Sequence, residues 1–425
     1  MSSTATHPAQ IALPRPAALL RACPAETGAA ALWSAGPHGP RLLLGQPGAW
    51  LFPTSLAALQ EAWDRARADG AVLIGALSYD LGGALEPAAG NRAGGDSGWP
   101  DIAFARCDAW LALEGGRWTG PLAPPAPGPE AEPGAFTVGP LRSATGAARY
   151  QRDVACIIDR IRAGDVYQVN LAHRLRGSFR GSPRALFDAL ASAARPWHGA
   201  YLEIPGDPQR IICSVSPELF LDYEPGARRL TTRPMKGTRP GGADPGELAA
   251  AAKDTAELNM IIDLMRNDLG RSCAFGSIEV TRPRTIERHG AGPGQVLQAT
   301  ATISGTLRAD ISLLEALAGA FPPGSVTGAP KIQAMRMIGS LEPLARGPYC
   351  GAVGALRPDG GASFNVAIRT ALLTGQRVGP GAIDGELSWS VGAGVVADSD
   401  PAAEWQETLD KAAILASATG ATIEA

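Results

Sequence analysis

A proline- and glycine-rich stretch at residues 120–140, GPLAPPAPGPEAEPGAFTVGP, constrains the fold of this chain more than any other feature. Proline fixes its own backbone and lacks an amide donor, so this stretch is not expected to form a helix or a central strand. Before it, short apolar runs alternate with glycine and proline turns. After it, longer patterned segments begin. We interpret residues 120–140 as an exposed connection that ends an N-terminal region (1–140) and precedes a second region at 145–421.

Helices and strands alternate in the second region. Apolar residues recur at helical spacing in 150–163 and 253–270, and 398–418 reads as a helix with Asp400 as its N-cap. Alternating or continuous apolar patterns predict strands at 166–175, 210–223 and 364–373. The chain therefore contains both element types, with no internal repeat.

Composition and charge exclude several classes of protein. The formal net charge is −3 and the 38 lysines and arginines are scattered, so there is no basic stripe of the kind that binds nucleic acid. The 6 cysteines lie far apart, which argues against a zinc site or a disulfide framework. The first residues lack the pattern of a signal peptide, and no apolar run approaches the ~20 residues that span a bilayer. We expect a cytoplasmic protein that binds neither nucleic acid nor membrane.

Lys236 stands in the sequence TTRPMKGTRP, between Pro234 and Gly237. A lysine in a polar turn is usually a solvated side chain. A lysine held in a rigid turn can also act as a nucleophile if its amine is kept neutral. The local sequence does not separate these two interpretations.

Two expected helices each carry a pair of acids three residues apart, Asp254 with Glu257 and Glu404 with Glu407. Residues at this spacing share one face of a helix. Acids in a first helical turn commonly face water and favour the helix dipole. If the two helices face each other, these carboxylates can instead hold Mg²⁺, which prefers oxygen ligands and keeps positions for substrate.

Three further segments contain candidate binding residues. The turn GSVTGAPK (324–331) departs from the order of a P-loop, but its backbone amides and Ser325 can hold an oxyanion. Gly392 and Gly394 lie in a strand-like run, where something approaches the backbone closely. Arg369 is alone in an apolar strand, where its partner is either a protein carboxylate or an anionic ligand.

Taken together, eight segments of the chain resemble the chorismate-utilising enzymes, a family that includes component I of anthranilate synthase and of aminodeoxychorismate synthase and the isochorismate and salicylate synthases. The resemblance implies an α/β fold of the α+β type, in which two large antiparallel β-sheets pack together and are flanked by helices. The N-terminal region matches weakly and, in this family, completes the same body. In chain order the segments are AGDVYQVNLAHR (163–174), SVSPELFL (214–221), TTRPMKGT (231–238), KDTAELNMIIDLMRNDLGR (253–271), GSVTGAPKIQAMRMI (324–338), GPYCGAVGAL (347–356), IRT (368–370) and VGAGVVADSDPAAEWQETLDKA (391–412).

The resemblance also implies roles for individual residues. It implies that a carboxylate of chorismate is bound through Mg²⁺ and that Glu218 is the general acid. The implied substrate-binding residues are Gln168, Ser325, Tyr349, Arg369, Gly392 and Gly394, and the implied Mg²⁺ ligands are Glu257, Glu404 and Glu407, with Asp254 nearby.

Two positions distinguish between members of the family. Isochorismate and salicylate synthases have a lysine base where this chain has Gln168, and an amide cannot deprotonate water. Anthranilate synthases typically read P-I-A-G-T where this chain reads PMKGT, and the lysine form, Lys236, resembles component I of aminodeoxychorismate synthase. The resemblance therefore predicts the amination of chorismate to 4-amino-4-deoxychorismate through a lysine intermediate, in the route to 4-aminobenzoate and folate.

We see no Cys/His pair of a glutaminase in the sequence, so a separate glutamine amidotransferase subunit is expected to supply ammonia. The alternatives are component I of an anthranilate synthase or a non-catalytic chorismate-binding subunit. The second alternative arises because Gln298 occupies the place of a histidine that the family usually has. In anthranilate and salicylate formation that histidine is associated with pyruvate elimination. His289 is expected in a nearby glycine-rich loop and is not assigned its role.

Overall fold

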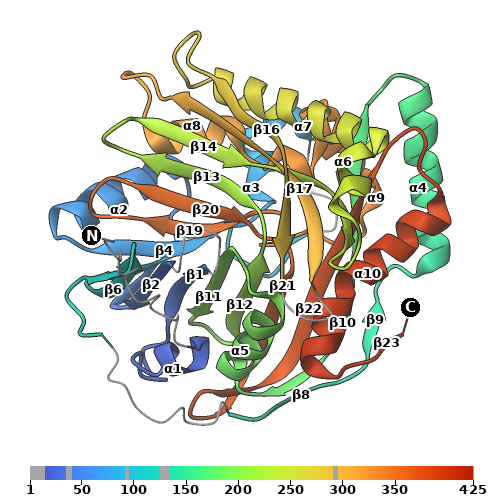
Figure 1. The fold of residues 1–425 in the computed structure, drawn as a ribbon. Coiled ribbons are helices and arrows are strands. Elements are labelled where there is room, and N and C mark those ends of the chain that lie inside the picture. Colours follow the sequence, from blue (N-terminus) through green and yellow to red (C-terminus); the bar gives the residue numbers. More distant parts are fainter. Residues whose placement is uncertain (1–14, 35–40, 91–94, 125–133, 291–294, 425) are drawn as a thin grey trace, which may run out of the picture.

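The computed structural model describes residues 15–34, 41–90, 95–124, 134–290 and 295–424. Within these residues the chain forms two large sheets, which we call the first and the second sheet (Figure 1). Every strand pair is antiparallel except β9 with β23. The first sheet has 13 strands: β1 (Ala30–Ser34), β2 (Arg41–Gln46), β6 (Ala109–Glu114), β7 (Arg117–Thr119), β8 (Phe136–Val138), β9 (Leu141–Ser143), β10 (Gln168–Gly181), β11 (His198–Ile204), β12 (Gln209–Ser216), β18 (Gly328–Ala329), β21 (Thr370–Gly379), β22 (Ala382–Val395) and β23 (Ile423–Glu424).

The second sheet has 10 strands within the described residues, in the order β15-β17-β14-β13-β20-β19-β4-β5-β3, with β16 also paired to β17. Strands from the N-terminal region enter both sheets, so residues on either side of the 120–140 connection share one body. The strands are β3 (Ala49–Leu51), β4 (Val72–Leu77), β5 (Ile102–Cys107), β13 (Leu219–Glu224), β14 (Arg229–Arg233), β15 (Met235–Pro240), β16 (Glu279–His289), β17 (Val296–Thr306), β19 (Ala352–Leu356) and β20 (Ala362–Val366).

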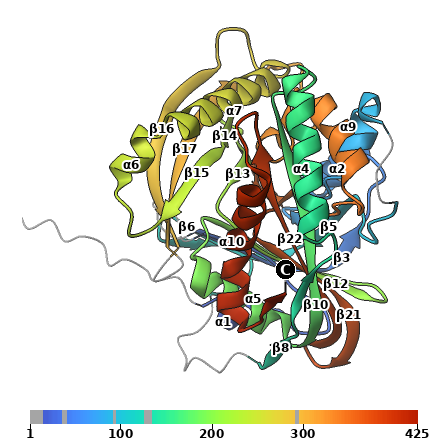
Figure 2. The same cartoon turned by 90° about the vertical axis from the view of Figure 1, so that its right-hand side faces the viewer.

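Helices cover the outer faces of the two sheets. α2, α7 and α8 pack on the second sheet, whereas α1, α5 and α10 pack on the first, and α4 lies beside α10 (Figure 2). The helical segments are α1 (Pro16–Leu20), α2 (Leu56–Ala68), α3 (Leu81–Leu85), η1 (Pro87–Ala89), α4 (Ala147–Arg162), α5 (Pro183–Ala194), α6 (Pro245–Ala250), α7 (Ala252–Gly270), α8 (Leu313–Ala320), η3 (Gly324–Val326), α9 (Lys331–Leu341) and α10 (Pro401–Thr419).

The inner faces of the two sheets meet through alanines together with leucine, isoleucine and valine side chains. This buried cluster includes Ala76, Ala103 and Ala105 from the second sheet and Ala200 from the first. Small side chains allow the two sheets to approach closely, and apolar burial contributes about 25 cal/mol per Å². The architecture confirms the predicted fold of two packed antiparallel sheets flanked by helices.

The three predicted helices are present as α4, α7 and α10. Asp400 is the N-cap of α10, as predicted, because its carboxylate accepts hydrogen bonds from the amides of Ala402 and Ala403. Gly270 is the last residue of α7, in agreement with the predicted end of that helix. No helix among the described residues is both long and apolar enough to cross a membrane.

The structure describes both ends of the 120–140 connection. Residues 125–133 lie outside the described residues, but 136–138 form the short strand β8, which pairs with β10. Because β8 lies off the main strand order of the sheet, it does not contradict the prediction that this stretch forms no central strand. The segment AFTVG between Pro133 and Pro140 contains residues that favour strands, and it pairs at the periphery of the sheet, where proline is tolerated nearby.

Candidate active site

The candidate site lies where the chain crosses from one sheet to the other. β12 of the first sheet continues into β13 of the second through Pro217 and Glu218, and β20 returns to β21 through residues 367–369. The two crossovers are joined by hydrogen bonds, from the Val366 amide to the Glu218 carbonyl (3.1 Å) and from the Val215 amide to the Arg369 carbonyl (2.9 Å). Glu218 and Arg369 therefore lie on adjacent crossovers.

This position corrects two predictions. Residues 210–223 and 364–373 were each expected to form one strand, but each is divided between two sheets. Arg369 has a φ of 48°, in the left-handed region that non-glycine residues rarely occupy. Pro217 interrupts the first apolar pattern and Arg369 the second, but neither residue by itself shows that the chain enters another sheet.

Glu218 is 3% exposed and accepts a hydrogen bond from the hydroxyl of Ser325 on η3. Burial raises the pKa of its carboxyl group to about 7, while the Ser325 hydrogen bond and the charge of Lys236 act in the opposite direction. A carboxyl group with this pKa holds a proton near neutral pH and can still release it. Glu218 is therefore suited to general acid catalysis.

The pKa of Glu218 predicts how stability depends on pH. Between its ordinary pKa of 4.5 and the folded value of about 7, Glu218 keeps its proton in the folded chain and loses it in the unfolded chain. The free energy of unfolding should therefore decrease as pH rises through this window, by about 3 kcal/mol from this group. Denaturant unfolding at pH 5 and pH 8 tests this, because Glu218→Gln should lose less stability between these two pH values than the wild type. An identical pH dependence in both proteins would contradict the assignment.

Lys236 lies on β15 beside a β-bulge. The pairing of β15 with β17 shifts between Lys236 and Thr238, and Gly237 between them has a φ of 78°. A Cβ atom on Gly237 would also lie 2.9 Å from the Asp254 carboxylate. The glycine in PMKGT is thus required by the bulge and by the approach of α7.

Burial lowers the pKa of the Lys236 amine, and the nearby ammonium of Lys411 lowers it further. The carboxylates of Glu257, Glu407 and Glu218 oppose this shift. Lys236 is therefore a partly buried amine with acids from three elements nearby. This environment excludes the interpretation of Lys236 as a solvated loop lysine.

Gly392 and Gly394 lie on β22 where two side chains of the site approach the strand. A Cβ atom on Gly392 would lie 3.1 Å from the hydroxyl of Tyr349, and one on Gly394 would lie 2.8 Å from Nζ of Lys236 and 2.4 Å from Nε2 of Gln168. Each glycine therefore makes room for side chains of the candidate site. β22 pairs with β21 only as far as Trp389, so its last residues have β10 as their only long strand partner among the described residues.

Gln168 and Arg369 both have unused hydrogen-bonding groups. The side-chain amide of Gln168 is fully buried, and it has no hydrogen-bond partner in the described part of the chain. Burial lowers the pKa of Arg369 to about 10, and among residues 15–424 that are described no side chain forms an ion pair with it. Buried polar groups of this kind normally have partners, so this pattern is consistent with a polar, anionic ligand.

The acids on α7 and α10 face the site unequally. Glu407 lies 2.7 Å from Nζ of Lys411, and Glu404 accepts a hydrogen bond from Ser399. Glu257 and Glu407 both act on the charge of Lys236, whereas Asp254 forms an ion pair with Arg239 at 2.7 Å.

Within the described residues no group of three or more His, Cys, Asp or Glu side chains is close enough to hold a metal by itself. Glu257 on α7 and Glu407 on α10, which both act on the Lys236 amine, nevertheless fit Mg²⁺. Mg²⁺ needs only one or two protein carboxylates, because it takes its remaining oxygen ligands from substrate and water.

Lys411 was not predicted from the sequence. Its ammonium forms an ion pair with Glu407 and donates a hydrogen bond to the carbonyl of Gly392 at 2.8 Å. Lys411 therefore links α10 to β22 inside the site. In the sequence, Glu407 and Lys411 look like an ordinary surface pair one helical turn apart. Only the packing of α10 against β22 distinguishes them.

Gln298 and His289 lie on adjacent strands. Gln298 is opposite Thr238, and its Nε2 donates to the Thr238 hydroxyl at 3.4 Å. His289 is the last residue of β16, so the prediction that it lies in a loop is wrong. Its ring lies 4.0 Å from that of Trp197, and its Nε2 is 3.5 Å from a Glu287 oxygen. The strand β16 extends further than its glycine-rich end suggested because it pairs along β17.

The fold and this arrangement of acids, lysine and arginine fit a binding site for a small anionic ligand. The profile of the family described as chorismate binding enzyme matches residues 46–417, and the chain belongs to that family. The predicted resemblance is therefore confirmed at the level of the family.

Curated relatives from two branches of the family match at similar identity. Anthranilate synthase component 1 3 of Haloarcula marismortui is 37% identical over 296 residues, 68% of this chain and 55% of that protein. Aminodeoxychorismate synthase component 1 of Escherichia coli is 40% identical over 258 residues, 59% of this chain and 53% of that protein. The chain thus spans about half the length of these relatives, and identity alone does not separate the two products.

Solved structures share the fold. A putative 2,3-dihydroxybenzoate-specific isochorismate synthase of Bacillus anthracis superposes with a TM-score of 0.72 at 20% identity, covering 95% of this chain and 99% of that one. Anthranilate synthase component I of Streptococcus pneumoniae gives a TM-score of 0.69 at 24% identity, covering 91% and 90% of the two chains.

Proposed function

We propose that this chain converts chorismate and ammonia to 4-amino-4-deoxychorismate, for 4-aminobenzoate and folate synthesis. The observation that carries this proposal is the pairing of a lysine whose pKa is lowered, Lys236, with a carboxyl group whose pKa is raised, Glu218. A neutral amine can attack carbon, and a protonated carboxyl group can release a leaving hydroxyl as water. Each charge also acts on the other, which indicates that they serve one site.

In the first displacement, Nζ of Lys236 forms a bond to C2 of chorismate. Both ring double bonds shift, from C1=C2 to C1=C6 and from C5=C6 to C4=C5, and they shift back in the second displacement. The C4–O bond breaks, and Glu218 gives its proton to the departing hydroxyl, which leaves as water. The lysine nitrogen is then a secondary ammonium bonded to C2, and Glu218 is a carboxylate.

In the second displacement, ammonia bonds to C4 and the C2–N bond breaks, so that Lys236 leaves as a neutral amine. The new ammonium at C4 returns a proton to Glu218. Two displacements restore the original face of the ring at C4, which one direct displacement would invert. A separate glutamine amidotransferase subunit supplies the ammonia in this proposal.

The other site residues bind and orient the substrate. Arg369 has no anionic protein partner among the described residues, and with the Tyr349 hydroxyl it binds the enolpyruvyl carboxylate. Glu257 and Glu407, with Glu404 behind them, would hold Mg²⁺, which neutralises the ring carboxylate when bound. Ser325 orients Glu218. Gly392 and Gly394 make room for Tyr349 and Lys236, and their backbone amides are proposed to bind a carboxylate of the substrate.

The second candidate function is the formation of anthranilate. It is favoured by the anthranilate synthase relatives, which are about as similar to this chain as the aminodeoxychorismate synthases. Against it stand Lys236, which a direct attack by ammonia at C2 does not need, and Gln298, which cannot act as a base. A non-catalytic chorismate-binding role conflicts with the shifted pKa values of both Lys236 and Glu218.

The deciding experiment incubates purified protein with chorismate, Mg²⁺ and ammonium. Products are separated by chromatography against authentic standards before mass spectrometry, because the two amino isomers of chorismate have equal mass. We expect 4-amino-4-deoxychorismate. Anthranilate or isochorismate would overturn the proposed product, and an inactive protein, even with a glutaminase partner, would favour the binding-subunit role.

Removing either acid that reaches Lys236 should weaken Mg²⁺ binding. We expect Glu257→Gln and Glu407→Gln each to raise the Mg²⁺ concentration needed for half-maximal activity by at least about 10- to 100-fold. The control is Glu61→Gln, on the exposed face of α2, which should leave the Mg²⁺ dependence unchanged. Unaltered Mg²⁺ titrations of the two site variants, by activity and by calorimetry with chorismate present, would contradict the assignment.

A further inference from the structure

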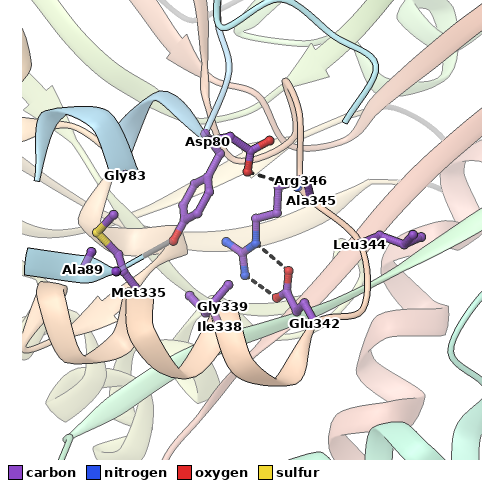
Figure 3. A pocket seen from close by; sticks show the side chains of 12 residues that line it. Asp80, Gly83, Ala89, Met335, Ile338, Gly339, Glu342, Leu344, Ala345 and Arg346 are labelled. Atoms are coloured by element: carbon purple, nitrogen blue, oxygen red, sulfur yellow. Dashed lines mark hydrogen bonds and ion pairs between the residues drawn. The ribbon is translucent and has the colours of Figure 1, made fainter. Parts of the chain in front are cut away.

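Arg346 is a buried arginine outside the residues so far given a role. It lies in the loop between α9 and β19 and is 3% exposed. Its guanidinium forms a two-point ion pair with Glu342, with Nε–Oε2 at 2.9 Å and Nη2–Oε1 at 2.6 Å. Figure 3 shows this pair in the wall of a pocket that α9 forms with Tyr79 and Asp80.

The remaining donors of Arg346 reach two segments of the candidate site. Nη1 donates to the carbonyl of Val326, the residue after Ser325, at 2.9 Å. Nη2 donates to the carbonyl of Asn170 at 2.6 Å, and Asn170 is paired with Gly394. Arg346 therefore holds the turn that carries Ser325 and the strand that lies against the site glycines.

Glu342 and Tyr349 extend these contacts. Oε1 of Glu342 accepts a hydrogen bond from the amide of Ala172 at 2.9 Å, and Ala172 is paired with Gly392. The guanidinium carbon of Arg346 lies 5.9 Å from the ring of Tyr349, whose hydroxyl lies against Gly392. The Arg346–Glu342 ion pair therefore contacts both the turn that carries Ser325 and the strand that is paired with Gly392 and Gly394. We call these segments, with Tyr349, the substrate-binding wall.

Arg346 is itself held by the N-terminal region. The carboxylate of Asp80 accepts hydrogen bonds from the amides of Arg346 (3.3 Å) and Gly347 (2.8 Å). The ring of Tyr79 lies 4.5 Å from the guanidinium carbon of Arg346. The segment after β4 therefore contacts both the backbone and the guanidinium of Arg346.

We propose that Arg346 is a positioning residue for turnover of chorismate, which aligns Ser325, Tyr349 and the β22 glycines and couples their alignment to the N-terminal region. The proposal rests on the proposed use of these residues as the substrate-binding wall. A planar guanidinium can hold Glu342 and two carbonyls at once, whereas an ammonium cannot reproduce that geometry. A displacement of about 1 Å in such a wall can lower turnover about 100-fold.

The test compares Arg346→Lys with a matched control, Arg184→Lys. Arg184 also forms a two-point ion pair, with Glu203 at 2.7 and 3.1 Å, and also donates to two carbonyls, but it holds the segment that follows α1. We expect Arg346→Lys to raise the KM for chorismate about 10-fold and to lower kcat about 10- to 100-fold. A loss of folded protein leaves KM unchanged, so this readout separates positioning from stability. Arg184→Lys should keep the wild-type KM.

An unchanged KM and kcat in Arg346→Lys would overturn the proposal, as would equal changes in both variants. If Arg346→Lys does not fold, Glu342→Gln decides, because it keeps the arginine and removes its ion pair; it should raise KM in the same direction. Chorismate consumption is followed whatever the product, so a different product refutes the proposed function and leaves this comparison intact. If the wild type consumes no chorismate, calorimetric binding of chorismate replaces KM, with the same expected difference.

Discussion

Lys236→Ala is expected to abolish amination of chorismate, with a loss of kcat on the order of 10³-fold or more. Among the lysines that the structure describes, only Lys236 has its amine against Gly394. The carboxylates of Glu257, Glu407 and Glu218 all act on the pKa of this amine. Without it, ammonia must displace the hydroxyl in one step. Steady-state rates at saturating ammonium, with intact-protein mass spectrometry of quenched wild-type reactions, provide the measurement.

A matched control removes a different buried ammonium. Lys331 lies 2.7 Å from Asp268 and joins α9 to α7, but contacts none of the proposed catalytic residues. Lys331→Met should lower stability and leave kcat per folded molecule near the wild-type value. Full activity of Lys236→Ala would rule out the covalent route. So would a wild-type enzyme in which no lysine adduct can be trapped under any quench condition.

The second large effect is expected at Glu218. Glu218→Gln keeps the size of the side chain and removes its proton, so kcat should fall about 10²- to 10⁴-fold. In the wild type, kcat should decrease as pH rises above about 7, because the acid that protonates the leaving hydroxyl loses its proton there. The variant should lack this decrease.

The pH profile must be measured at saturating ammonia, or with glutamine and the partner subunit, because alkaline pH also converts ammonium to ammonia and raises the rate. Ser325→Ala is the companion variant, since it removes the hydrogen bond that lowers the pKa of Glu218. Its kcat should decrease at a higher pH than that of the wild type. A wild-type kcat that stays level between pH 6 and 8.5, at saturating ammonia, would be incompatible with Glu218 as the acid.

Local sequence pattern predicted elements better than it predicted their assignment to sheets. The helix at 401–419 follows from Asp400, a proline in the first turn and a repeating apolar face, all of which act within a few residues. The crossovers at Glu218 and Arg369 have a weaker local signal, because Pro217 and Arg369 interrupt the strand patterns without showing that the chain enters a second sheet. Which sheet it joins depends on partners more than a hundred residues away, such as the bond between Val366 and Glu218.

Recognition of the family supplied roles that residue chemistry alone left open. From the sequence alone, Lys236 was either solvated or nucleophilic, and the acids of α7 and α10 were either first-turn acids or ligands. In the structure the lysine is partly buried, with its pKa lowered, and Glu257 and Glu407 approach it from two helices. Asp254 differs, because it is paired with Arg239.

The sequence by itself determined the class of this protein, because its motifs need specific side chains in a specific order: glycine at the bulge after Lys236, acids three apart on two helices, and a glycine pair on one strand. The tertiary structure decided which groups change their chemistry. Burial raises the pKa of Glu218 and lowers that of Lys236, and burial exists only once both sheets are packed. Lys411 and Arg346 acquire their contacts in the same way, because their partners come from distant strands that no local pattern specifies.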